Sequence, residues 1–278
     1  MSLKKLMHRT IRKTDPETTI GDVARLMCHY KIGSIFIEEQ DRFIGIVTET
    51  TLVRKVFAHH VSSQTPVRAF MDAPLISIDV TQSTMEANHL MHFNHIRHLG
   101  VTEAGTVVGV LSVRDLVRHF LSEKHDGPLA AIADIVKPLT VLIHRNLQTI
   151  PAFASIQEAA CKMAERQIGS LVVMDTAAET AQPIGLITET DLVRKGLGQS
   201  MDPTGTSVGA LMTQPIIDID LSRSIDDAVS LMVTHGVRHL LVSESGKIVG
   251  ILSVRDFIGM ISIRDLPRYF KPQGNDGA

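Results

Sequence analysis

Residues 45–55 read GIVTETTLVRK, and the chain returns to this phrase three more times. The other copies are GVLSVRDLVRH from Gly109, GLITETDLVRK from Gly185 and GILSVRDFIGM from Gly250. Counted from Gly45, successive leading glycines are 64, 76 and 65 residues apart. A phrase that recurs at such intervals indicates a repeated structural unit. The sequence therefore predicts four copies of one small module, which together fill almost the whole chain.

A second pattern precedes each glycine phrase and marks the start of a helix. A serine or threonine is followed three residues later by an acid, as in Ser155 and Glu158. This spacing is typical of a capping box. A methionine lies eight residues after each cap, on the apolar face of the expected helix, so we expect it in the core. The caps are Thr19, Ser83, Ser155 and Ser224, and the methionines are Met27, Met91, Met163 and Met232.

Two short apolar stretches follow each of these helices. In the first copy they are residues 34–37 and 43–47, and a polar turn separates them, which is typical of a hairpin. The glycine phrase ends the second stretch and opens another helix. One more extended piece precedes the first helix, at residues 74–78 and 215–219 in copies two and four. The predicted unit is strand, helix, strand, strand, helix, which is an α+β fold.

The four copies fall into two types. Copies one and three share the letters TET before LVRK, whereas copies two and four share LSVRD. Gly185 follows Gly45 by 140 residues and Gly250 follows Gly109 by 141, so a pair of units was duplicated. Segments rich in polar residues, glycine or proline are expected to be linkers, at residues 59–65, 122–133 and 196–205. We expect the repeats at residues 1–60, 66–122, 134–197 and 206–265.

This unit, with Gly-apolar-x-Ser/Thr-x-x-Asp at its last strand-to-helix turn, resembles the cystathionine β-synthase (CBS) domain. The resemblance covers essentially the whole chain. It implies that consecutive domains pack through their sheets into pairs called Bateman modules, of which this chain would have two. It also implies that clefts between paired domains bind adenosine-containing ligands: AMP, ADP or ATP, with S-adenosylmethionine less favoured. Most members of the family are regulatory.

The glycine phrase carries groups that suit such a ligand. The glycine permits close approach of backbone, and a serine and an aspartate three residues apart stand at a helix start that favours anions. Ser/Thr-x-x-Asp is also an ordinary helix cap that needs no ligand, and both interpretations stay open. The resemblance assigns ribose binding to Asp115, Asp191 and Asp256, and phosphate binding to Ser112, Thr188 and Ser253.

A basic pair distinguishes copies two and four. Arg97-His98 and Arg238-His239 stand at the start of the middle strand, where the resemblance implies contact with phosphates. An exposed strand end is the alternative. Copies one and three have Gly-Ser at this place, and copy one also has Thr51 instead of the acid. Because threonine cannot accept two diol hydrogen bonds while keeping a charge, we expect a degenerate site in copy one and about two good sites elsewhere.

The resemblance assigns two further groups of residues. His8-Arg9 and His144-Arg145 each stand eleven residues before a helix cap. A regulatory subunit of the AMP-activated protein kinase has a similar pair, whose arginine reaches a phosphate held by another repeat. Arg9 and Arg145 are therefore candidate phosphate ligands, with solvated basic residues as the alternative. The expected adenine-side pocket consists of Pro74, Leu75, Ile76, Pro215, Ile216 and Ile217.

Composition argues against several classes of function. The 278 residues have a net charge of −2, so no basic excess points to nucleic acid. No apolar run reaches about 18 residues, and residues 1–12 do not form a secretory signal, so we expect neither a membrane span nor export. Cys28 and Cys161 fit buried thiols in a reducing cytoplasm. A run of histidines at every third position, from His89 to His98, leaves its helix near Asn94, so we expect no metal site.

These observations favour a stand-alone cytoplasmic regulator that binds adenine nucleotides and signals to an unidentified partner by conformational change. We expect a homodimer, no required cofactor and no catalysis, because no P-loop, GxGxxG run or nucleophile elbow is present. The alternative is a ligand-free module for oligomerisation or protein docking.

Overall fold

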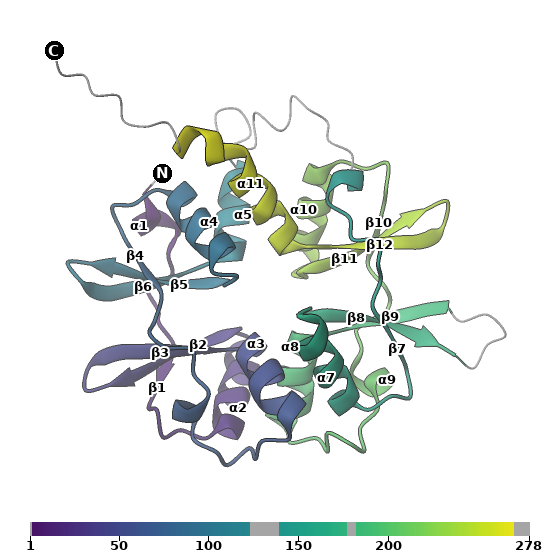
Figure 1. Cartoon of the computed structure of the whole chain (residues 1–278), viewed down its shortest axis with the longest axis horizontal. Helices are drawn as coiled ribbons and strands as arrows, with labels where there is room; N and C mark the ends of the chain where they lie inside the picture. Colours follow the sequence, from purple (N-terminus) through teal and green to yellow (C-terminus); the bar gives the residue numbers. More distant parts are fainter. Residues whose placement is uncertain (1, 123–138, 177–181, 270–278) are drawn as a thin grey trace. The chain divides into compact units, whose positions relative to one another are not determined.

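The computed structural model describes residues 2–122, 139–176 and 182–269, and within them the chain forms four three-stranded sheets (Figure 1). In the first sheet, β1 (Lys13–Thr14) runs parallel to β2 (Ser34–Glu39), and β2 pairs antiparallel with β3 (Arg42–Thr48). The other sheets repeat this order. Their strands are β4 (Ser77–Asp79), β5 (His98–Glu103), β6 (Thr106–Ser112), β7 (Thr149–Pro151), β8 (Ser170–Asp175), β9 (Gln182–Thr188), β10 (Asp218–Asp220), β11 (His239–Glu244) and β12 (Lys247–Ser253).

The predicted order of strand, helix, strand, strand, helix is confirmed in each repeat, and the first strand begins later than expected in repeats 2 and 4. The extended pieces expected at residues 74–78 and 215–219 become strands only at Ser77 and Asp218. Residues 123–133 of the second expected linker, and residues 134–138 at the start of the third expected repeat, lie outside the described residues.

The first helix of every repeat begins at its predicted cap. The cap side chain accepts a hydrogen bond from the backbone N–H three residues on, and the predicted methionines are buried. Hydrogen bonds from the backbone and hydroxyl of Ser155 hold the pKa of Glu158 below its ordinary value, and Ser224 does the same for Asp227. These helices are α2 (Ile20–Tyr30), α4 (Thr84–Phe93), α7 (Ile156–Arg166) and α10 (Ile225–His235).

The second helix differs between the two types of repeat. Repeats 2 and 4 continue as the regular α5 (Val113–Ser122) and α11 (Val254–Tyr269). Repeats 1 and 3 instead form a short α-helix, then a π-helical turn, then a 3-10 turn. The first of these series is α3 (Glu49–Thr51), Leu52–Val56 and Phe57–His59, and the second is α8 (Glu189–Asp191), Leu192–Gly196 and Leu197–Gln199. Short helical pieces elsewhere are α1 (Leu3–Leu6), α9 (Val208–Leu211), Val67–Ala69 and Leu139–Val141.

The chain divides into two compact units that do not follow the order of the repeats. One unit consists of Thr10–Ile76 and Arg145–Asp218, which hold repeats 1 and 3. The other consists of Met1–Arg9, Ser77–His144 and Ile219–Ala278, which hold repeats 2 and 4. Repeats of the same sequence type therefore pack together.

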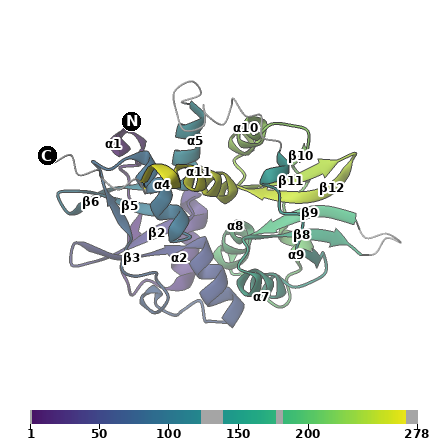
Figure 2. The same cartoon turned by 45° about the horizontal axis from the view of Figure 1, so that its top comes forward.

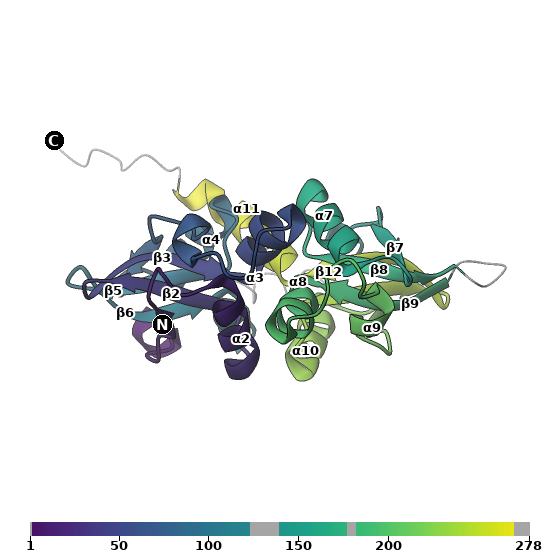
Figure 3. The ribbon, with the colours of Figure 1, turned by 90° about the horizontal axis from the view of Figure 1, so that it is seen from below.

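Packing is reciprocal in the unit of repeats 1 and 3. Helix α2 contacts the turn Leu197–Gln199, and α7 contacts the equivalent turn Phe57–His59 (Figure 3). Buried side chains from both repeats form one hydrophobic core, which includes Ile37 and Val173. In the other unit, α11 packs against α4 and α5 (Figure 2), and the side chain of Asn88 donates to the carbonyl of Ile258 at 3.3 Å.

Two buried glutamates join repeats 1 and 3. Glu49 is fully buried and lies 3.1 Å from Arg194 of the other repeat, and Thr190 donates to it at 3.0 Å. The arrangement is mirrored by Glu189, which is 1% exposed, lies 3.4 Å from Arg54 and accepts from Thr50 at 2.9 Å. Repeats 2 and 4 have Val113 and Val254 at the position of these glutamates. The buried charges therefore match repeat 1 to repeat 3.

We expect Arg194→Leu to destabilise the chain by roughly 3 kcal/mol, because it removes the cation beside a fully buried carboxylate. The double variant Glu49→Leu/Arg194→Leu should lose less, because the buried charge is removed as well. Denaturant titration measures both. Glu39→Gln is the control, because the Glu39–Arg68 pair is exposed and should contribute less than about 1 kcal/mol. Equal losses for Arg194→Leu and the control would contradict this account.

Candidate functional site

A short piece of chain crosses the last strand of each repeat beside its leading glycine. In repeat 2, His8 exchanges two backbone hydrogen bonds with Val110, at 2.8 and 2.9 Å. Equivalent bridges join Asp72 to Ile46, His144 to Ile251 and Thr213 to Leu186. We name these crossing pieces straps; they are residues 7–8, 71–72, 143–144 and 212–213.

The glycines make room for the straps. A Cβ atom added at Gly109 would lie 2.6 Å from the sulfur of Met7 and 3.0 Å from the carbonyl oxygen of His8. At Gly45 it would lie 2.9 Å from the carbonyl oxygen of Asp72. The sequence predicts close approach of backbone at the glycine, where a side chain would block a ligand. In the structure the strap makes this approach, with its backbone and its side-chain atoms beside the glycine.

The straps of repeats 2 and 4 bring a histidine to the predicted acid. His8 Nε2 lies 3.0 Å from Asp115 Oδ1, and His144 Nε2 lies 2.9 Å from Asp256 Oδ1. The histidine side chains are 64% and 65% exposed, whereas the aspartates are only 9% and 16% exposed. Each pair therefore presents an imidazole to solvent above a largely buried carboxylate.

The second oxygen of each acid caps its helix. Asp115 Oδ2 accepts from the backbone N–H of Ser112 at 2.8 Å and from its hydroxyl at 2.5 Å. Asp256 Oδ2 accepts from the backbone N–H of Ser253 at 2.6 Å. One oxygen of each carboxylate, Oδ2, thus bonds the serine at the helix start, and the other, Oδ1, faces the strap.

In repeat 3 the acid pairs with a lysine of the following helical turn, whereas in repeats 2 and 4 it pairs with a strap histidine. Asp191 Oδ2 accepts from the backbone and the hydroxyl of Thr188, at 3.0 and 2.6 Å. Its Oδ1 lies 2.7 Å from Lys195 Nζ and accepts from the strap hydroxyl of Thr213 at 3.2 Å. In repeat 1 Thr48 caps the helix and Thr51 closes the capping box, with its hydroxyl accepting from the backbone N–H of Thr48 at 3.2 Å and lying 2.9 Å from the Thr48 hydroxyl.

The strand register brings the predicted basic pairs to the same turn. His98 lies directly opposite Ser112 on the neighbouring strand, and His239 lies opposite Ser253. The carbonyl of Arg97 accepts from the first backbone N–H of α5 at 3.0 Å. Both basic pairs are half-buried, including Arg238, so they are not simply an exposed strand end.

The remaining predicted residues lie next to the straps in sequence. Arg9 and Arg145 directly follow strap histidines and are exposed. The expected adenine-side residues follow the straps of repeats 1 and 3, where Pro74 and Pro215 are exposed and the four apolar residues after them are half-buried. The four apolar residues are Leu75, Ile76, Ile216 and Ile217. The straps themselves were not predicted to be parts of the site.

Other places in the described residues do not add to this group. No three histidine, cysteine, aspartate or glutamate side chains there could hold a metal ion together. Burial, with His95 and His89 nearby, lowers the pKa of His92 below its ordinary value. In the same described portion, every helix is too short or too polar to cross a membrane.

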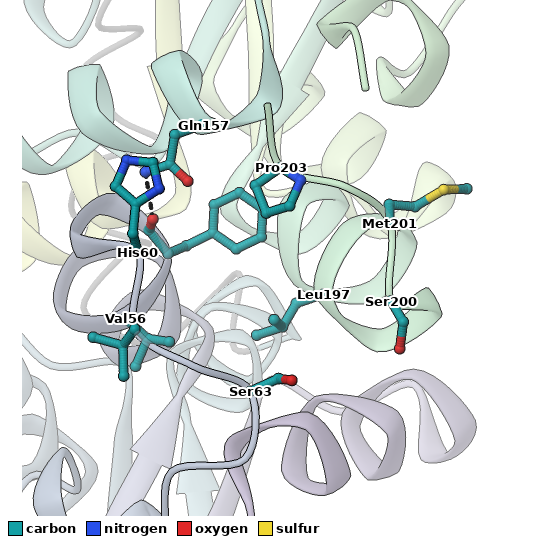
Figure 4. Close-up of a pocket in the computed structure, with 10 residues that line it drawn as sticks. Val56, His60, Ser63, Gln157, Leu197, Ser200, Met201 and Pro203 are labelled. Atoms are coloured by element: carbon teal, nitrogen blue, oxygen red, sulfur yellow. Dashed lines mark hydrogen bonds between the residues drawn. The ribbon is translucent and has the colours of Figure 1, made fainter. Parts of the chain in front are cut away.

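A cavity of about 190 Å³ lies in the unit of repeats 1 and 3 (Figure 4). Gln157 and Pro203 line it together with Phe57, whose carbonyl accepts from the Gln157 amide at 2.6 Å. None of the predicted site residues lines this cavity.

Comparison with known proteins gives a consistent family. The model of the CBS domain matches residues 3–58, 67–122, 134–198 and 208–263. The chain is 39% identical over 102 residues to an uncharacterised protein of Methanopyrus kandleri, a match that covers 36% of this chain and 50% of that protein. It is 27% identical over 146 residues to the CBS domain-containing protein YhcV of Bacillus subtilis, covering 52% of this chain and 98% of that protein.

One solved structure has the same fold over nearly the whole chain. It is protein MJ1225 of Methanocaldococcus jannaschii, described as a candidate archaeal homologue of g-AMPK. The TM-score is 0.76 at 17% identity, and the match covers 94% of this chain and 99% of that one. The sequence match with the same protein is 27% identical over 197 residues and covers 67% of this chain and 68% of that protein.

We expect Gly109→Ala to destabilise the chain by about 1–3 kcal/mol, because the new methyl group overlaps the Met7 side chain. Met7→Ala should make the same substitution cheaper, since it removes the overlapping sulfur atom. Denaturant titration of the two single variants and the double variant measures this coupling. If Gly109→Ala lowered the free energy of unfolding equally in both backgrounds, the Met7 side chain would not be what excludes a methyl group at Gly109.

Proposed function

Because the chain belongs to the CBS domain family, we propose that it is a regulatory protein that binds adenine nucleotides and reports their level to a partner. Its four CBS domains are consistent with two tandem Bateman modules. One observation carries the proposal. In repeats 2 and 4, three groups meet at the same strand-to-helix turn: a carboxylate that caps the helix, a strap histidine, and the half-buried Arg-His pair at the start of the middle strand.

The proposed ribose acceptors are Asp115, Asp191 and Asp256. Each has one oxygen engaged in capping and another that faces a side chain with access to solvent. A carboxylate oxygen can accept two hydrogen bonds, so an arriving diol can share Oδ1 with its present partner or replace it. The burial of the aspartates keeps their orientation fixed before the ligand arrives.

The proposed phosphate ligands are the capping hydroxyls and the nearby cations. In repeats 2 and 4 the hydroxyl of the serine stands opposite His98 or His239, next to an arginine that can bind phosphate in a bidentate manner. Thr188 lacks this basic pair and has Lys195 nearby instead. Arg9 and Arg145 could add a further cation from outside the turn. Repeats 2 and 4 are therefore the better sites for ADP or ATP.

The adenine ring is proposed to lie against the half-buried apolar residues that follow the straps of repeats 1 and 3. An adenine base needs an apolar face more than a charge. AMP, ADP and ATP suit the basic pairs better than S-adenosylmethionine, which has no phosphate for them to bind. The description of MJ1225 as a candidate homologue of g-AMPK supports this choice of ligand class.

Signalling would use the straps. The strap of repeat 2 continues at Thr10 into the other compact unit, and the strap of repeat 4 continues at Arg145. A nucleotide that changes the hydrogen bond between His8 and Asp115 therefore acts on a connecting segment. Such a ligand shifts the conformational equilibrium by its differential affinity for the two states. We further propose a homodimer without catalytic activity in the cytoplasm, which fits the two free thiols, Cys28 and Cys161.

A ligand-free docking module is the second candidate. It is favoured by the fact that each acid already has a structural role as a cap. Under this alternative, the straps and buried ion pairs serve only to hold the repeats together for contact with another protein. Titration with nucleotides distinguishes the two.

We expect calorimetric titration of the whole chain with AMP, ADP and ATP to give saturable heat. The double variant Asp115→Asn/Asp256→Asn should weaken binding at the sites of repeats 2 and 4 at least about tenfold, and so bind fewer nucleotides per chain at the original affinity, since a hydrogen bond to a charged group contributes about 1.5–3 kcal/mol. Asparagine is chosen because its amide oxygen can still accept from the capping serine.

The matched control is Glu103→Gln/Glu244→Gln, which removes two exposed charges from the hairpin ends of the same repeats. It should bind as the wild type does. Absence of binding by the wild type at millimolar nucleotide would rule out the sensor and leave the docking module.

A further inference from the structure

Repeats 1 and 3 have exchanged an acid and a hydroxyl between two places. Thr51 and Asp191 both stand three residues after a capping threonine, and each closes a capping box with it. Asp72 and Thr213 both stand on a strap, and each bridges to the strand residue that follows the glycine. The acid of repeat 3 therefore lies on the helix, and the acid of repeat 1 lies on the strap.

The same set of groups results in both repeats. In repeat 1 the Thr51 hydroxyl donates to Asp72 Oδ2, and Lys55 Nζ lies 2.6 Å from Asp72 Oδ1. In repeat 3 the Thr213 hydroxyl lies 3.2 Å from Asp191 Oδ1, and Lys195 Nζ lies 2.7 Å from the same oxygen. Each repeat thus has one carboxylate, one hydroxyl that bonds it and one ammonium group on the following helical turn.

An ordinary surface ion pair is the simpler explanation of Asp72 and Lys55. The Asp72 side chain is 46% exposed, and exposed ion pairs contribute little. The backbone of Asp72, however, is held by two hydrogen bonds to Ile46, at 2.8 and 3.0 Å, and by its close approach to Gly45. The backbone hydrogen bonds, the close approach to Gly45 and the Thr51 hydroxyl therefore hold the Asp72 carboxylate in place. An ordinary surface ion pair has no such support.

We propose that repeat 1 has a fourth carboxylate site for the vicinal diol of an adenine nucleotide, in which Asp72 replaces the acid missing at Thr51. The proposal rests on the proposed function, in which the carboxylates of the other repeats accept a ribose. It replaces the expectation of a degenerate site, which considered only the residue within the repeated phrase. Asp72 is also more exposed than the other three acids, so a diol reaches it more easily.

The test uses AMP and a full-length chain in which the other three acids are neutralised, Asp115→Asn/Asp191→Asn/Asp256→Asn. We expect this triple variant to keep about one AMP site per chain in equilibrium dialysis. Adding Asp72→Asn should weaken that site at least about tenfold, and 2′-deoxy-AMP should bind the triple variant correspondingly more weakly than AMP. Adding Asp22→Asn is the control, because Asp22 has a similar exposure of 49% and its own ion pair.

A second change guards against loss of folding. In the triple background, Thr51→Asp/Asp72→Thr reproduces the arrangement of repeat 3 and should retain the site. If the wild type binds no AMP, the proposed function fails. If the wild type binds AMP but the triple variant binds none, or if Asp72→Asn leaves the residual site unchanged, the inference about Asp72 is overturned while the proposed function stands.

Discussion

The passage of a strap across the strand glycine is the contact on which each site depends. A Cβ atom added at this glycine would lie only 2.6 Å from the nearest strap atom in three of the repeats, which is too close for a side chain. Because the strap can come so close, it forms two backbone hydrogen bonds with the strand, and its polar side chain reaches the turn where the acid or hydroxyl caps the next helix. The four repeated glycines are thus explained by protein packing first, and any ligand chemistry follows from it.

The second constraint decides which repeats pack together. Glu49 and Glu189 are buried and have arginines of the opposite repeat beside them, so repeat 1 fits repeat 3. Repeats 2 and 4 have Val113 and Val254 at the position of these glutamates, so the reciprocal pair of glutamate–arginine contacts cannot form with a repeat of the other type. The residues that distinguish the two types of repeat therefore favour the pairing of repeat 1 with repeat 3. Repeats 2 and 4, which lack these glutamates, have the basic pairs instead.

Local features were predictable and long-range ones were not. The caps, the hairpins and the buried methionines follow from spacing within ten or so residues, and Ser155 begins its helix where the pattern predicts. The straps escaped prediction because His8 lies 101 residues before Gly109, and no periodicity connects them. The carboxylate proposed for repeat 1 belongs to Asp72, 21 positions after Thr51, so the repeated phrase by itself could not point to it. Sequence spacing likewise could not tell which segment of the chain passes over the repeated glycine.

The most direct test of the proposed chemistry is a crystal structure of the whole chain grown with AMP. The account predicts AMP with its ribose hydroxyls within about 3.2 Å of the carboxylate oxygens of Asp115 and Asp256, and of Asp72 in repeat 1. An AMP molecule whose ribose contacts other side chains, or crystals that contain no AMP at saturating concentration, would contradict it.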